Sequence, residues 1–505
     1  MTQDTRDVIV IGAGPAGLAA AQSVAEHGLS VRLIDEQGAA GGQIWRNAAA
    51  VTQRGGALSK SYTGATAALC AVQQARIDHA TSATVLDVAL SKAPETGPEM
   101  GPETGSETGS ETGSETGPET GPVCVTWLSA AHGNRGIRET TARALIIATG
   151  ALERPVLFPG ATLPGVMGVG AVQSILKQSG LVPSGESVVL AGHGPLLLLT
   201  LSQILDHGGS VAAVLDLGQS RLTEAVTGLV PALLSDPALM AKGASLLWRA
   251  RRSGVVWHRN VTRLRAMGSE GIEKVAFETG GKTVQLPCAL LAVHDGVIPN
   301  TQLTRLLALD HDWSAAQQAF AARVTPEGRT SAPSVWVAGD GAGIAGAEVA
   351  GMRGTLAGLD VARALGALAA KEARTHLYPL KKRIARRAPA RALIDRLFAP
   401  LPVTAFAQGE VADSTLVCRC EAVTLTRILE AIADGATGPN RVKTFTRCGM
   451  GACQGRICGN PLTRIVAEAM QSTSQDAGAL RIRPPLKPTL ISDYLEPAPK
   501  DAPPS

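Results

Sequence analysis

The chain opens with a short hydrophobic strand that runs straight into a glycine-rich turn, and this pattern restricts its fold more than any other. The run Val8–Ile11 is followed by the turn Gly12-Ala13-Gly14-Pro15-Ala16-Gly17, where a helical pattern begins. Gly12 permits a tight turn, Gly14 lets a pyrophosphate approach the backbone, and Gly17 allows close packing of helix on strand. The helix N-terminus adds N–H donors and a positive dipole. A dinucleotide-binding unit is therefore expected here.

The second predicted strand supports this interpretation, because it ends in two acids. Asp35 and Glu36 lie roughly 20 residues beyond the turn, the distance at which a carboxylate meets the ribose hydroxyls of a bound dinucleotide. Either acid fits, and the spacing does not choose between them.

Further hydrophobic runs alternate with helical patterns, and several run into glycine-rich turns. They are Val31–Ile34, Leu145–Ile147, Val188–Leu190, Val211–Leu215 and Val335–Val337. This alternation is typical of parallel α/β units. A chain of 505 residues exceeds one ordinary core, so about two to four domains are expected. Near the C-terminus, Thr424 precedes a helical pattern and is a candidate N-cap.

Three segments have compositions of their own. Residues 94–121 are consecutive tetrapeptides of the form Pro/Ser-Glu-Thr/Met-Gly, which cannot offset their ordering entropy, and a disordered surface insert is expected. Residues 366–412 are helical and basic in pattern, a linker that Pro379 and Pro389 are expected to punctuate. Residues 476–505 are Pro-rich and are expected to form an extended or loose tail.

Five of the eight cysteines gather near the C-terminus. They are Cys418, Cys420, Cys448, Cys453 and Cys458. Thiolates grouped in this way converge on a soft metal centre, and four suffice for an iron–sulfur cluster or for zinc. Cys418 and Cys420 provide one ligand pair. The spacing allows either Cys448 with Cys453, or Cys453 with Cys458, as the second pair.

Two later strands end in turns that add to the first one. One strand runs into Thr149-Gly150 and the other into Gly339-Asp340. With the first turn they resemble the two-dinucleotide-domain flavoprotein family, which implies FAD, with Asp340 at its ribityl or phosphate region. The resemblance implies a Rossmann-like FAD domain made of residues 1–160 and 326–365. It also implies an inserted NAD(P)-like domain, residues 161–325.

A second glycine turn lies inside this inserted segment. Gly192-His193-Gly194 repeats the strand–turn–helix pattern, and Asp216 ends the next strand. Leu197 replaces the third glycine, so NAD(P), an adenine nucleotide and a vestigial site all stay open. Disulfide reductases of this fold carry a cysteine pair that Gly41-Gly42-Gln43 lacks. A flavin in this chain therefore needs another electron partner.

Several segments together resemble the larger, α-type subunits of heteromeric flavin dehydrogenases: opine oxidases, D-hydroxyproline dehydrogenase and hydrogen cyanide synthase. These segments are Asp35-Glu36-Gln37, Gly41-Gly42-Gln43, Leu152–Pro155, Leu163–Val166, Gly194–Leu197 and Cys418–Thr424. Residues 413–475 resemble the small helical [2Fe-2S] domain related to bacterioferritin-associated ferredoxin. That resemblance implies Cys418, Cys420, Cys453 and Cys458 as ligands and leaves Cys448 spare.

The resemblance also implies partners. A β subunit of the D-amino-acid-oxidase type would carry its own FAD and oxidise the C–N bond of an opine, D-hydroxyproline, glycine or similar substrate. Also implied are FMN at the subunit interface and a small [2Fe-2S] ferredoxin-like γ subunit. This chain would pass electrons through FAD and [2Fe-2S] towards an acceptor, with peripheral membrane contact where the acceptor is a quinone. The alternatives are a stand-alone NAD(P)H-dependent ferredoxin-type reductase and a non-enzymatic assembly subunit.

Other features bear on function more weakly. His193 and His294 are expected to be structural, so no catalytic residue is assigned. An aromatic content of 3% argues against nucleic-acid binding, and the basic residues near Lys381 fit a solvated helix face. No apolar run reaches the ~18 residues of a membrane span. The N-terminus shows no signal-peptide pattern, so a cytoplasmic location with reduced thiols is expected.

Overall fold

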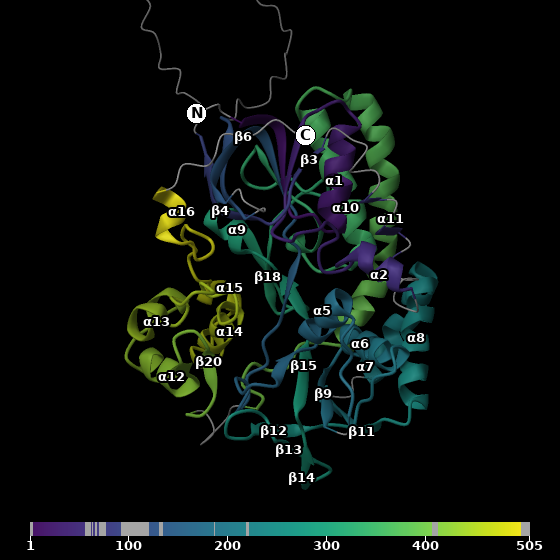
Figure 1. Ribbon diagram of the computed structural model, residues 1–505, viewed down its shortest axis with the longest axis vertical. Helices are drawn as coiled ribbons and strands as arrows, with labels where there is room; N and C mark the ends of the chain where they lie inside the picture. Colours follow the sequence, from purple (N-terminus) through teal and green to yellow (C-terminus); the bar gives the residue numbers. More distant parts are fainter. Residues whose placement is uncertain are drawn as a thin grey trace, which may run out of the picture.

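A mostly parallel sheet is built around β1 (Asp4–Ile11) in the computed structural model (Figure 1). Its other strands are β2 (Val31–Ile34), β3 (Ile77–Ala80), β4 (Ala83–Leu90), β5 (Val123–Ser129), β6 (Gly136–Ile147) and β19 (Val335–Val337). The strand order is β3-β2-β1-β6-β5-β4, and β19 pairs with β6. β1, β2, β3, β6 and β19 run parallel, and β5 pairs antiparallel with β6 on one side and with β4 on the other. Because β19 comes late in the chain, this sheet is completed only after the second nucleotide-binding unit.

The structure describes residues 4–55, 77–91, 121–130, 135–185, 187–218, 222–406 and 413–495, together with residues 62, 64, 65, 68 and 69. The tetrapeptide insert, apart from Gly121, lies outside the described residues, and so does Cys70. The expected α/β fold is confirmed, and the predicted strands Val8–Ile11, Val31–Ile34 and Val335–Val337 all lie in this first sheet.

Two helices pack tightly on one face of the first sheet. They are α1 (Pro15–Ala25) and α10 (Ala347–Ala364). A Cβ at Gly354 would lie 2.1 Å from the carbonyl oxygen of Ala16, so only glycine lets the helices approach this closely. The opposite face is covered in part by α9 (Gln302–Leu306) and the hairpin of β17 (His311–Ser314) and β18 (Ala319–Ala322).

The second nucleotide-binding unit is a five-stranded parallel sheet. Its strands are β8 (Val166–Gly168), β9 (Val188–His193), β10 (Ala213–Asp216), β11 (Val256–His258) and β15 (Leu290–Asp295). The strand order is β11-β10-β9-β15-β8. The chain reaches β9 from β8 on one side of it and continues to β10 on the other side, so the strand order reverses at β9. Ligands of such sheets bind in the crevice beyond the carboxyl ends of the strands at this switch point.

Helices cover one face of this second sheet, and a small antiparallel sheet covers the other. The helices are α5 (Val169–Ser179), α6 (Pro195–Asp206) and α8 (Pro237–Arg252), whereas α7 (Leu222–Ser235) packs against α8 and the long helix described below. The small sheet consists of β12 (Thr262–Met267), β13 (Lys274–Thr279) and β14 (Lys282–Pro287). The chain enters and leaves the unit through an antiparallel pair, β7 (Ala151–Glu153) and β16 (Val297–Pro299).

The basic segment after the first sheet is one long helix, α11 (Ala370–Leu397), which packs on α10 and α7. We expected Pro379 and Pro389 to interrupt it, but the helix runs through both. An interior proline removes a backbone hydrogen bond. The buried side of the helix, which includes Leu377 and Leu393, offsets this loss by packing against its neighbours.

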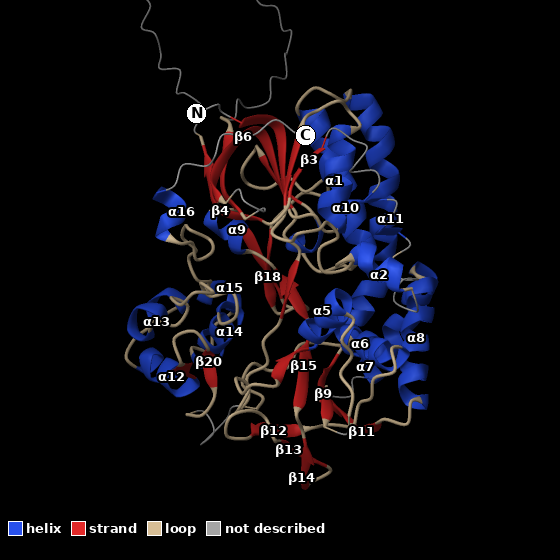
Figure 2. Cartoon of the chain, in the orientation of Figure 1, coloured by secondary structure: helices blue, strands red, loops and turns tan. Residues whose placement is uncertain are grey.

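The C-terminal unit is mostly helix and loop (Figure 2). It contains β20 (Leu416–Cys418), β21 (Val423–Thr424), α12 (Leu425–Ala433), α13 (Pro439–Thr446), α14 (Gly459–Ala469) and α15 (Ser474–Ala477). The predicted cap is confirmed, because the side chain of Thr424 accepts a hydrogen bond from the amide of Arg427.

The segment after α15 runs back to the first sheet and leads to α16 (Ile491–Leu495). The Leu486 amide donates to the Leu86 carbonyl at 2.7 Å, which ties this part of the expected loose tail to β4. None of the described helices combines the length and apolar character needed to cross a membrane.

Candidate functional site

A cavity of about 770 Å³ lies where the two nucleotide-binding units meet, within the range of cofactor pockets. The predicted cofactor residues that line it are Gly12, Gly14, Pro15, Ala16, Asp35, Glu36, Gly42, Gln43, Thr149, Gly150, Gly194 and Asp340. Gly17, Gly192 and Gly339 do not line it, because each packs against backbone or side chain behind the turns. Two turns far apart in sequence, the first and the second glycine turn, therefore open into one cavity.

The first glycine turn forms a cradle with no room for side chains. Gly12 has a φ of +103°, and a Cβ there would lie 2.5 Å from the carbonyl oxygen of Ala148. A Cβ at Gly17 would lie 1.7 Å from the carbonyl oxygen of Gly12. A Cβ at Gly42 would come within 2.8 Å of the Gly14 Cα, so a second loop closes over the turn. This geometry fits a pyrophosphate held against bare backbone, as FAD requires.

The two acids left open by the sequence have different partners. Asp35 is 7% exposed, and its carboxylate accepts from the amide of Ala13 at 2.5 Å and from the amide of Gln37 at 2.7 Å. Through the Ala13 amide, Asp35 thus holds the backbone of the glycine turn in place. The Glu36 carboxylate lines the cavity and pairs with Lys487 of the C-terminal segment.

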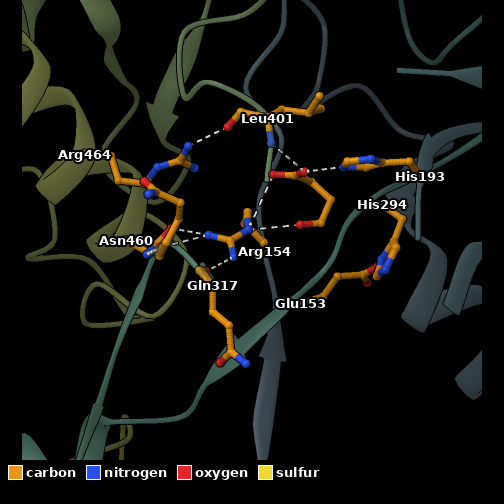
Figure 3. Close-up of polar contacts among 10 residues, drawn as sticks. Glu153, Arg154, His193, His294, Gln317, Leu401, Asn460 and Arg464 are labelled. Atoms are coloured by element: carbon orange, nitrogen blue, oxygen red, sulfur yellow. Dashed lines mark hydrogen bonds and ion pairs between the residues drawn. The ribbon is translucent and has the colours of Figure 1, made fainter. Parts of the chain in front are cut away.

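A buried guanidinium joins the parts of the chain beside the cavity (Figure 3). Arg154 donates from Nε to the Asp295 carbonyl at 2.9 Å, from Nη1 to the Gln318 carbonyl at 2.9 Å, and from Nη2 to the Gln317 carbonyl at 2.5 Å. Nη1 also lies 3.2 Å from Asn460 Oδ1 on α14. Burial lowers the pKa of Arg154 to about 10, which leaves it charged at neutral pH.

Two histidines stand at the switch point, each beside a carboxylate. His193 Nε2 lies 3.0 Å from Asp295 Oδ1, and the same oxygen accepts from the Leu401 amide at 3.0 Å. His294 Nδ1 lies 2.6 Å from Glu153 Oε1. Both imidazoles line the cavity, as does Glu153. Each ring is held at the cavity wall by a carboxylate, and the structural role expected for both histidines stays a prediction.

Sequence reasoning missed the charged residues of this wall. Glu153 and Arg154 directly precede Pro155, a context typical of a turn. Lys487 lies in the tail that was expected to be loose, yet it lines the cavity. The only sequence signal for Glu153 and Arg154 was that they belong to the Leu152–Pro155 segment used for the family resemblance.

The clustered cysteines meet at one end of the C-terminal unit. The Sγ atoms of Cys418, Cys448 and Cys458 all lie within 4.8 Å of one another. The thiols of Cys448 and Cys458 and the amide of Gly449 hydrogen-bond the Cys418 sulfur and lower its pKa.

The other two predicted ligands form a neighbouring pair. Cys420 is exposed and makes its thiol contact with Cys453. The group of three sulfurs includes Cys448, the cysteine that the resemblance leaves spare, and lacks Cys420 and Cys453. An all-thiolate set of this kind fits a [2Fe-2S] cluster.

One residue of the cysteine loop reaches the cavity. Arg456 lies between Cys453 and Cys458 in the sequence and lines the cavity wall. Its Nη1 donates to the Cys453 carbonyl at 3.3 Å, and its Nη2 donates to the Leu486 carbonyl at 2.5 Å. The loop that carries two predicted cluster ligands therefore borders the predicted flavin site.

The second glycine turn packs closely against β15 at its first glycine. A Cβ at Gly192 would lie 2.0 Å from the carbonyl oxygen of His294, and Leu197 is buried in the core where a third glycine would stand. The Asp216 carboxylate accepts from the Gly218 amide at 3.0 Å. Within the described residues no cysteine lines the cavity.

Two segments of the chain match models of known protein families. Residues 6–354 match the pyridine nucleotide-disulphide oxidoreductase family, which implies FAD, and residues 416–468 match the BFD-like [2Fe-2S] binding domain. The A-type component of opine oxidase from Rhizobium meliloti is 36% identical over 491 residues, covering 97% of this chain and 87% of that protein. The chain belongs to the family of A-type opine oxidase subunits.

Other members and neighbours agree with this family. The corresponding opine oxidase protein of Agrobacterium tumefaciens (strain Ach5) is 37% identical, with 97% and 91% of the two chains covered. Hydrogen cyanide synthase subunit HcnB of Pseudomonas protegens is 29% identical, with 96% and 97% covered. L-proline dehydrogenase from P. horikoshii shares the fold, with a TM-score of 0.64, 17% identity, and 97% and 79% covered. Family membership makes the chain a flavin and [2Fe-2S] subunit of a heteromeric oxidoreductase.

Proposed function

We propose that this chain is the electron-transfer subunit of a dehydrogenase that oxidises the C–N bond of an opine, D-hydroxyproline, glycine or a similar amino or imino acid. A partner subunit of the D-amino-acid-oxidase type holds the substrate and its own FAD. FMN at the interface and a small [2Fe-2S] γ subunit complete the complex, which works in the cytoplasm. The names of the relatives, opine oxidase and hydrogen cyanide synthase, support this substrate class.

The observation that carries the proposal is the position of Arg456. It lines the cavity with one side and hydrogen-bonds the Cys453 carbonyl with the other. A flavin can take up two electrons together and release them one at a time, and a [2Fe-2S] centre accepts one electron at a time. With no cysteine among the described cavity residues, the cluster is the remaining electron partner within the chain.

The residues of the chain would hold the two groups as follows. The bare backbone of the turn from Gly12 to Gly17 would receive the pyrophosphate, and Glu36 would receive the ribose. Asp340, whose Oδ1 accepts from the Ala345 amide at 3.0 Å, faces the cavity from the opposite turn. The cluster takes its ligands from the set Cys418, Cys420, Cys453 and Cys458.

The test is anaerobic reduction of the reconstituted complex by candidate substrates. Substrate should bleach the partner's flavin and then produce the [2Fe-2S] electron-paramagnetic-resonance signal. In Cys453→Ser the bleaching should persist while dye reduction falls at least about tenfold, because the protein no longer positions the second centre. Full dye reduction by Cys453→Ser would instead favour an assembly role without electron transfer.

A stand-alone NAD(P)H-dependent reductase is the second candidate, because Gly194 of the second glycine turn opens into the same cavity. Its readout is NADH oxidation by the isolated chain. Rapid flavin bleaching by NADH, without the partner subunit, would favour this candidate over electron transfer from an amine substrate.

A further inference from the structure

Helix α7 presents an apolar face to solvent. Leu229 and Leu233 are 47% and 45% exposed, and Val230 and Leu234 are 63% and 73% exposed. Residues four apart lie on the same side of a helix, so these side chains form two adjacent rows. The opposite side, which includes Ala232, is buried against α11. Contiguous exposed apolar rows of this kind mark interaction sites.

Helix α8, which follows α7 after one residue, is basic and mostly exposed. Lys242, Arg249, Arg251 and Arg252 are all exposed. Trp248 is 58% exposed, and the Arg252 guanidinium lies 4.9 Å from the centre of its ring. Only Ala250 of this helix is buried.

The two helices carry no exposed acid between Leu229 and Arg252. Asp236 is the single acid in this stretch, and it is buried as the N-cap of α8, where it accepts from the Leu239 amide at 3.0 Å. The exposed charge along this stretch is therefore entirely positive.

Helix α11 adds further cations beside α7. A Cβ at Gly228 would lie 2.1 Å from Arg396 Nη2, so this guanidinium touches α7. Lys382, Arg383 and Arg386 of α11 are also exposed. α7, α8 and α11 occupy one side of the molecule, and α12 and α13 of the [2Fe-2S] domain occupy the other (Figure 1).

We propose that this side, the α7–α8 face, binds an anionic lipid surface. Apolar rows enter the boundary between headgroups and acyl chains, and flanking cations meet the lipid phosphates. Trp248 has the amphipathic character of side chains that settle at this boundary. A second copy of the chain fits poorly, because a symmetric contact would set the cations of α8 against each other. Since no described helix can span a membrane, the attachment is peripheral.

The experiment is co-sedimentation of the full-length chain with vesicles of phosphatidylcholine, with and without phosphatidylglycerol. Binding should require phosphatidylglycerol and weaken as salt is added. Val230→Glu/Leu234→Glu should abolish it, because the acids repel the surface and cannot enter the apolar boundary. Arg251→Gln/Arg252→Gln should weaken it by about fivefold for each cation removed.

Leu490→Glu/Ile491→Glu is the matched control, because these residues are 61% and 79% exposed but lie at α16. This variant should bind vesicles like the wild type, and all variants should keep their flavin content and thermal midpoint. The proposal fails if the wild type does not sediment with anionic vesicles, or if Val230→Glu/Leu234→Glu sediments equally well. It also fails if that variant keeps vesicle binding but loses the partner subunit, which would make the face a protein interface. None of these readouts depends on the proposed function.

Discussion

The guanidinium of Arg154 donates a 3.2 Å hydrogen bond to the side-chain oxygen of Asn460, which links the strand between the nucleotide-binding units to the [2Fe-2S] domain. Asn460 Nδ2 donates in turn to the Gln318 carbonyl at 2.9 Å. The position of the [2Fe-2S] domain is thus coupled to the same cation that holds the cavity wall. A change at this cation should affect both cofactor sites together.

Arg154 Nε also lies 3.4 Å from the Asp295 carboxylate, which is 3% exposed. Arg154→Met should therefore lower the free energy of unfolding by about 3 kcal/mol, because this buried charge loses its cation. Chemical denaturation measures the loss. Arg263→Met is the control, since the Arg263 side chain is 81% exposed and its removal should change stability by less than about 1 kcal/mol. Equal effects of the two substitutions would contradict the role of Arg154.

Cys453→Ser should remove iron and acid-labile sulfide from the chain, whereas Cys448→Ser should keep about two of each per chain. The reason is the ligand set implied by the family resemblance, although Cys448 stands within 4.8 Å of Cys418 and Cys458. Iron and sulfide analysis of the purified variants gives the answer. The reverse ranking would exchange Cys448 for Cys453 in the ligand set.

Glu36→Gln should weaken FAD binding by about tenfold, because it removes a charged acceptor at the cavity. Its stability should change by less than about 1 kcal/mol, because the ion pair with Lys487 that it breaks is exposed. Asp35→Asn should instead cost about 1–3 kcal/mol of stability, since one of the two amides it accepts from loses its acceptor. Flavin retention and thermal unfolding separate the two acids. Exchange of the two outcomes would assign the ribose to Asp35.

Lys177 makes stability depend on pH. Burial lowers its pKa to about 8, and its Nζ donates to the carbonyls of Gln43 and Ile44 at 2.9 and 3.1 Å. Between about pH 8 and 10.5 the unfolded chain binds more protons than the native one, so stability should rise with pH through this window. Relative to Lys177→Met, the wild type should gain up to about 3 kcal/mol between pH 7.5 and 10.5.

The control for this pH dependence is Lys274→Met, which removes an exposed lysine. Denaturation curves of this variant should follow those of the wild type at each pH. If the difference in stability between Lys177→Met and the wild type stays constant across the window, burial of Lys177 does not make the free energy of unfolding depend on pH.

Local signals were sufficient to predict the fold and much of the cavity. Short motifs define the turn at Gly12, the acids Asp35 and Glu36, and the Gly339-Asp340 turn. The residue types and their spacing within each motif were therefore enough to predict these sites. Thr424 was predictable as a cap for the same reason, because capping depends on neighbouring residues.

The rest depends on contacts across long sequence separations. Arg154 and Asn460 are 306 residues apart, and Lys487 meets Glu36 from 451 residues away. No local pattern encodes such pairs. The expected breaks at Pro379 and Pro389 were wrong for a related reason. The packing of α11 on α7 and α10 outweighs the low helix propensity of proline.

The return of the C-terminal segment to the first sheet has a consequence for synthesis. Leu486 and Lys487 belong to the cavity wall, while the first glycine turn lies within residues 12–17. Domains usually fold as they leave the ribosome, the N-terminal part first. Here the wall is complete only when nearly the whole chain has emerged, so the nascent polypeptide cannot present a finished flavin site. We therefore expect full flavin affinity only after residues 486 and 487 have been made.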